Sequence, residues 1–97
     1  MPVGTFYVGY VATPKNWGLN TGSGARSAKF PIKFGEGFSN PPQVVVAMSG
    51  LDVGNGANTR VELGVEKVTP TGFTLVVKTW ADTVLYSVWG MWYAELE

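Results

Sequence analysis

Short runs of alternating hydrophobic and polar residues follow one another along the chain, and glycines and prolines separate them. Successive side chains of a strand point to opposite faces, so an alternating run predicts a half-buried β-strand. No segment has the hydrophobic period of an amphipathic helix. Residues 1–97 are therefore predicted to form one all-β domain, a six-stranded antiparallel β-sandwich with essentially no helix. The expected strands are residues 3–11, 26–34, 43–48, 60–67, 72–80 and 86–96.

The strand expected over residues 72–80 shows how the two faces are assigned. Phe73, Leu75 and Val77 share one face, which has the composition of a core face. The opposite face carries Lys78 and Trp80, an unusual pair for a surface that meets only water. Applied to the other strands as well, the rule predicts a core that includes Phe30, Ile32, Phe34, Val61, Leu63, Val65, Phe73, Leu75, Val77 and Trp92.

Two predicted strands, residues 43–48 and 86–96, are hydrophobic on both faces. A two-layer sandwich covers only one face of each sheet, and the other face of an antiparallel sheet is normally polar. We therefore expect another copy of the chain to cover the second face. The alternative is that these side chains are scattered surface hydrophobics, which are common.

Composition removes several classes of function. The chain has seven Lys and Arg and seven Asp and Glu, so its formal net charge is zero, and nucleic acid or an anionic membrane is a poor partner. It has no Cys and no His, so it lacks disulfides, a thiol nucleophile and the most common general base and metal ligand. No hydrophobic run is long enough to span a membrane. No signal peptide is visible at the N-terminus, which predicts a protein that is cytoplasmic or released without such a leader.

Catalysis has little support in this sequence. Asp52 with Asp82, or Glu62 with Glu66, would be the only carboxylate pairs for glycoside hydrolysis, and solvated surface positions or turn caps are the more common role. We therefore do not expect an enzyme, a metal site or a cofactor.

Carbohydrate binding has better candidates, because a sugar needs an aromatic face and planar groups with several donors or acceptors. Arg60, Trp80 and Tyr86 have these properties and are expected at strand ends. For each residue alone a structural role remains open: a surface salt bridge for Arg60, and packing on a neighbouring strand for Trp80.

From residue 41 onward the chain resembles the H-type lectin domain, the family of the snail agglutinins and of the C-terminal domain of slime-mould discoidins. The resemblance depends on Phe34, Phe38, Pro42-Gln-Val-Val-Val, Leu51-Asp52, Arg60-Val61, Val68-Thr-Pro-Thr-Gly-Phe73, Thr79-Trp80, Tyr86 and Trp92-Tyr-Ala94, in the order and spacing of the family. The match is good from residue 30 to residue 96 and poor over the first 25 residues.

The resemblance implies a six-stranded sandwich that forms a homotrimer, or a hexamer built from it. It also implies metal-independent binding of glycans with terminal galactose or N-acetylgalactosamine in the cleft between protomers. Arg60 would contact sugar hydroxyls, Trp80 would line the pocket, and Tyr86 would add a further contact. Asp82, two residues after Trp80, is a further candidate.

The sequence departs from the family pattern in the predicted loop of residues 13–25. Family members usually have an acidic acceptor there, and this loop has neither Asp nor Glu, which leaves Ser23 or Asn20 as replacements. The position after Trp80 is Ala81, where some snail members have a His.

Strict alternation also places Tyr86 on the core face with Trp92, so reaching a surface site requires a bulge between Tyr86 and Trp92 or a strand that starts after Tyr86. The alternative function is a trimeric attachment module that binds protein rather than glycan.

Overall fold

The computed structural model describes residues 2–96, which form six strands and one short 3-10 helix. The elements are β1 (Val3–Gly9), η1 (Pro14–Asn16), β2 (Arg26–Lys33), β3 (Gln43–Val53), β4 (Glu62–Glu66), β5 (Gly72–Thr79) and β6 (Leu85–Glu95). All six predicted strands are present, and the all-β prediction is confirmed. The single helical turn lies in the segment predicted to be a polar loop.

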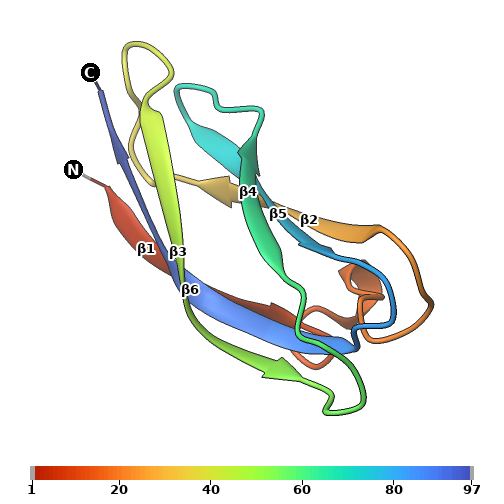
Figure 1. Cartoon of the computed structure of the whole chain (residues 1–97). Helices are drawn as coiled ribbons and strands as arrows, with labels where there is room; N and C mark the ends of the chain where they lie inside the picture. The colour runs from red at the N-terminus through yellow and green to blue at the C-terminus, as the bar shows by residue number, and fades with distance from the viewer. Residues whose placement is uncertain (1, 97) are drawn as a thin grey trace.

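The strands form two antiparallel sheets of three strands each, in the orders β1-β6-β3 and β2-β5-β4. Figure 1 shows the sheets as two layers. Only the connection from β4 to β5 stays within one sheet, so the other connections cross between layers at the ends of the sandwich. The loop that follows η1, the loop between β3 and β4 and the turn between β5 and β6 meet at the end opposite the start of β1 (Figure 1).

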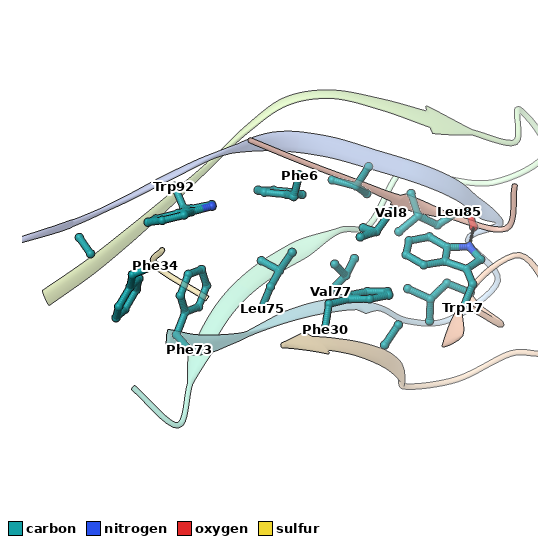
Figure 2. Close-up of a cluster of buried hydrophobic side chains, with 14 residues drawn as sticks. Phe6, Val8, Trp17, Phe30, Phe34, Phe73, Leu75, Val77, Leu85 and Trp92 are labelled. Carbon is teal, nitrogen blue, oxygen red and sulfur yellow. Dashed lines mark hydrogen bonds between the residues drawn. The ribbon is translucent and has the colours of Figure 1, made fainter. Parts of the chain in front are cut away.

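The core lies between the two sheets (Figure 2). Phe34, Phe73 and Trp92 pack at one end, with ring centroids 5.7 to 5.9 Å apart. At the other end Trp17 lies over Phe30, with ring centroids 6.2 Å apart, and the indole Nε1 donates to the Leu85 carbonyl at 2.9 Å. Six of the ten predicted core residues are buried: Phe30, Phe34, Phe73, Leu75, Val77 and Trp92.

The other four predicted core residues, Ile32, Val61, Leu63 and Val65, are only half-buried, although they pack against the core. Their segments lie at the edges of the sheet, in or beside β2 and β4, where a neighbouring strand covers only one side. Buried residues of β1 and of the loop between η1 and β2 complete the core instead. These residues are Phe6, Val8, Trp17 and Leu19.

The pairing of β3 with β6 differs from the prediction in two ways. First, β3 continues to Val53, five residues beyond the strand expected over residues 43–48. Second, Asp52 pairs with Ser87 and Val53 pairs with Leu85, so Tyr86 is an extra residue on β6. The bulge is therefore at Tyr86 itself, not between Tyr86 and Trp92 as expected, and it lets Leu85 and Val88 both point into the core.

The two outer faces have opposite characters. On the β2-β5-β4 sheet, Lys29 pairs with Glu66 at 3.1 Å and Lys78 lies 3.9 Å from Glu62. The β1-β6-β3 sheet instead exposes a hydrophobic surface, and we call this surface the apolar face. It includes Val3, Tyr7, Val45, Trp89, Met91 and Tyr93, each at least 38% exposed.

Two glycines allow the close packing of the β1-β6-β3 sheet. A Cβ at Gly90 would lie 2.7 Å from the Phe6 ring and would also collide with the Ala47 carbonyl oxygen. A Cβ at Gly50 would collide with the indole of Trp89. Real Cβ atoms do not tolerate such contacts, and backbone atoms cannot move aside easily.

Replacing Gly90 by Ala is therefore expected to lower the free energy of unfolding by about 1–3 kcal/mol, as overpacking does. Chemical denaturation measures this change. Gly56→Ala is the matched control, because a Cβ there meets open space. The control is expected to leave stability unchanged or to raise it by at most about 1 kcal/mol. Equal stabilities of the two variants would contradict the packing described for Gly90.

Candidate functional site

Three segments are hydrogen-bonded together at the end of the sandwich opposite the start of β1 (Figure 1). They are loop 18–25, the segment before β4 and turn 80–83. The Gly24 N–H donates to the Ala81 carbonyl at 2.9 Å, and the Thr83 hydroxyl donates to the Asn58 carbonyl at 2.6 Å. Candidate residues from distant parts of the sequence therefore lie on one connected surface.

Arg60 precedes β4, and its guanidinium lies against turn 80–83. Its Nη1 donates to Asp82 Oδ1 at 2.9 Å and to the Thr83 hydroxyl at 3.1 Å. Thr83 is fully buried, so its hydroxyl, which accepts from Arg60, is held in a fixed position. Within residues 2–96, Nε and Nη2 of Arg60 donate to no other group. Arg60 therefore presents unused donors beside the Asp82 carboxylate, which is 74% exposed.

Trp80 follows directly after β5 and is 41% exposed. The preceding residue, Thr79, is buried, and its hydroxyl donates to the Arg60 carbonyl at 2.6 Å. This bond ties the end of β5 to the segment that carries Arg60. Beside Trp80 lies a shallow groove, lined by Ala25, Arg26, Ser27, Lys78, Thr79 and Trp80.

Ser23 and Asn20 both lie in loop 18–25, and the structure separates them. Ser23 is exposed and precedes Gly24, whose N–H is bonded to turn 80–83, so Ser23 is beside the site. Asn20 follows Leu19, whose carbonyl accepts from the Leu85 N–H at 3.1 Å at the closed end of the core. Of the two residues, Ser23 is the one that the loop brings next to turn 80–83.

Tyr86 is not joined to the other candidates within one chain. The bulge directs it away from the core, and its ring packs on Tyr10 with centroids 5.5 Å apart. Among the described residues it makes no hydrogen bond or ring contact with Arg60, Trp80 or Asp82. Arg60 and Asp82 are therefore in direct contact, and Trp80 is joined to Arg60 through the hydroxyl of the adjacent Thr79, whereas Tyr86 has no such connection to them in the described part of the chain.

Two residues important for this surface were missed by the sequence reasoning. Thr83 is buried beneath Arg60, and Arg26 donates hydrogen bonds to loop 18–25 and to turn 80–83. A signal for Arg26 existed: it is the first residue of β2 and follows a glycine-rich loop that has no acidic partner for it. Thr83 had no comparable signal, because its burial depends on the loop between β3 and β4.

The carboxylates considered for catalysis are separated. Glu62 and Glu66 each lie beside a lysine on the β2-β5-β4 sheet, and Asp82 pairs with Arg60. In residues 2–96 no group of three or more acidic side chains could hold a metal ion. No described helix has the length and hydrophobicity to cross a membrane.

Comparison with known proteins identifies relatives by sequence. The chain is 39% identical over 74 residues to "ATP synthase subunits region ORF 7" of Fuscovulum blasticum, covering 76% of this chain and 64% of that protein. It is 34% identical over 79 residues to a Discoidin-1 polypeptide of Dictyostelium discoideum, covering 80% of this chain and 31% of that protein. The chain therefore spans less than two thirds of each of these relatives.

The fold has a counterpart among solved structures. Native recombinant discoidin II of Dictyostelium discoideum superposes with a TM-score of 0.85 at 26% identity, covering 99% of this chain and 36% of that chain. The family model of the H-type lectin domain matches residues 29–94. This range contains β3 to β5, most of β2 and of β6, and Arg60, Trp80, Asp82 and Tyr86. The chain belongs to the H-type lectin domain family, a family of non-enzymatic carbohydrate-binding modules.

Proposed function

We propose that this domain binds glycans with terminal galactose or N-acetylgalactosamine, without a metal ion, at the surface formed by Arg60, Asp82 and Trp80. The observation that carries this proposal is the state of Arg60. Its Nη1 is held by Asp82 and Thr83, while Nε and Nη2 have no partner among the described residues. A guanidinium that is held on one side and open on the other suits recognition of neighbouring hydroxyls.

Asp82 and Trp80 supply the acceptor and the apolar surface that Arg60 lacks. A sugar hydroxyl is both a donor and an acceptor, so a site needs acceptors as well as donors. The exposed Asp82 carboxylate accepts, and Trp80 offers an apolar surface for the C–H side of the ring. In this proposal Asp82 replaces the acidic acceptor that loop 18–25 lacks, and the Ser23 hydroxyl adds a weaker contact.

The separate position of Tyr86 supports a site shared between protomers. We propose that this chain forms a homotrimer through the apolar face and that Tyr86 of one protomer completes the site of its neighbour. A single small and wet site is expected to bind at about millimolar to micromolar affinity, which is about 4–8 kcal/mol. Three sites on one particle would raise the apparent affinity for a glycan-covered surface.

Asp82→Asn tests the carboxylate directly, because it keeps the shape and removes the negative charge. We expect binding of N-acetylgalactosamine to weaken about tenfold or more, since charged hydrogen bonds are about twice as strong as neutral ones. Isothermal titration calorimetry measures the affinity. Asp52→Asn is the matched control, since Asp52 is exposed on β3 and pairs with Ser87 in the ladder. Equal affinities for the parent and Asp82→Asn would remove Asp82 from the site.

Trp80→Ala and Arg60→Ala are expected to abolish red-cell agglutination, because they remove the apolar surface and the donors. Galactose and N-acetylgalactosamine should inhibit agglutination by the parent, and EDTA should have no effect. If both variants agglutinate as the parent does, the sugar site lies elsewhere on the chain.

The assembly is tested by light scattering at micromolar concentration, where we expect about three times the chain mass of 10.4 kDa. Met91→Glu places a charge on the apolar face and should dissociate the trimer, because an unpaired charge is costly to bury. Lys33→Glu, an exposed change on the other sheet, should leave the mass unchanged. A monomeric parent would exclude both the trimer and the shared site.

A second candidate function is a trimeric attachment module that binds protein rather than glycan. The absence of Asp and Glu from loop 18–25 favours it, because the usual family acceptor is missing there. A glycan array separates the two functions. A trimer that binds no glycan on the array would favour attachment to protein.

A further inference from the structure

We propose that Arg26 is a positioning residue of the sugar site: it holds loop 18–25 on turn 80–83 and thereby fixes the direction of Trp80 and Asp82. This inference rests on the proposed function, because it concerns the same surface. Arg26 is not expected to touch the sugar ring. Its effect would come through the backbone that carries the contacting residues.

The geometry of the guanidinium is the first observation. Arg26 donates to five backbone carbonyls, and a guanidinium has five N–H donors in a fixed planar fork. The acceptors are Gly24 (Nε, 2.9 Å), Leu19 and Thr21 (Nη1, 3.3 and 2.8 Å), and Ala81 and Thr83 (Nη2, both 3.0 Å). Nε and Nη1 therefore bind the loop, and Nη2 binds the turn. No carboxylate pairs with Arg26 in residues 2–96.

The conformation of the turn is the second observation. Ala81 has a φ of 56°, in the left-handed region that residues with a Cβ rarely adopt. Its carbonyl accepts from Arg26 Nη2 at 3.0 Å and from the Gly24 N–H at 2.9 Å. Such a conformation persists where surrounding bonds determine it. Ala81 lies between Trp80 and Asp82, so its backbone angles set the relative direction of these two side chains.

The loop has the flexibility to bring its carbonyls to Arg26. Gly18, Gly22 and Gly24 all have positive φ, between 76° and 84°. At these angles glycine has no steric penalty, so the loop can turn tightly enough for three of its carbonyls to face one guanidinium. The glycines of loop 18–25 therefore allow the backbone conformation in which the loop carbonyls accept from Arg26.

Arg26→Lys and Arg26→Met separate charge from geometry. Lysine keeps the charge but has a single ammonium, which cannot bind the carbonyls of the loop and of the turn at the same time. We expect both variants to weaken N-acetylgalactosamine binding to a similar extent, about tenfold or more, measured by calorimetry on folded protein. If a folded Arg26→Lys variant binds with parental affinity, Arg26 does not position the site through its fork.

Ala81→Gly in the Arg26→Lys background is the second test. Glycine adopts positive φ freely, so the turn keeps its conformation without Arg26, and part of the affinity should return. Lys67→Gly is the matched control, because Lys67 has a φ of 52° in the hairpin between β4 and β5, away from the site. An equal recovery with Lys67→Gly would mean that general stability, not turn geometry, explains the loss, and would overturn the proposal.

Hydrogen exchange tests the positioning without any sugar. The Gly24 N–H should exchange faster in Arg26→Lys than in the parent, while the Leu75 N–H in the central strand should be unchanged. An unchanged Gly24 rate would overturn the positioning role even if sugar binding is confirmed. If the parent binds no sugar but Gly24 exchange responds as expected, the proposed function fails and the role of Arg26 in ordering the turn is retained.

Discussion

The packing of Trp17 and Leu19 against the end of the core is the interaction on which the site depends. Both backbone groups of Leu85 bond to this loop: its carbonyl accepts from the Trp17 indole at 2.9 Å, and its N–H donates to the Leu19 carbonyl at 3.1 Å. Buried polar groups need partners, so these bonds fix the loop in addition to its apolar contacts. Arg26 and turn 80–83 are ordered on this support. Without the contacts of Trp17 and Leu19, loop 18–25 and turn 80–83 would lose their connection to the core.

The rest of the architecture follows from a two-layer sandwich that has one shared core and two outer faces. The β2-β5-β4 sheet covers its outer face with lysine and glutamate pairs, which suits contact with water. The β1-β6-β3 sheet exposes Tyr7, Trp89 and Met91 instead. Large exposed apolar surfaces are rare on monomers, and this asymmetry is the physical basis for the trimer that we propose. In the trimer that we propose, Tyr86, which lies apart from Arg60, would contribute to a neighbouring site.

Alternation of side chains was sufficient to predict the strands and much of the core, because Phe73, Leu75 and Val77 share the buried face of β5. It failed where the chain leaves regular structure. Trp17 and Leu19 are buried from a loop whose composition is polar, and no periodicity marks them. The parity of β6 indicated an irregularity near Tyr86, yet its position at Tyr86 itself depends on the pairing with β3.

The candidate site was predictable in part. Arg60 and Asp82 were both identified from the sequence, and their 2.9 Å contact joins residues 22 positions apart. Arg26 and Thr83 were missed: the glycine-rich loop before Arg26 was a signal, but its carbonyl acceptors are visible only in the fold, and no residue pattern marks the buried Thr83 hydroxyl. The left-handed angle at Ala81 was equally hidden, because that residue type normally avoids it.

The placement of Trp80 at the sugar site that we propose can be measured directly, because the chain has four tryptophans. Each indole N–H gives a separate ¹H–¹⁵N signal, and titration with N-acetylgalactosamine reports which ring meets the ligand. This placement predicts a shift of the Trp80 signal, with Trp17 and Trp92 unchanged because both are buried in the core. A titration that shifts Trp89 on the apolar face and leaves Trp80 unchanged would contradict it.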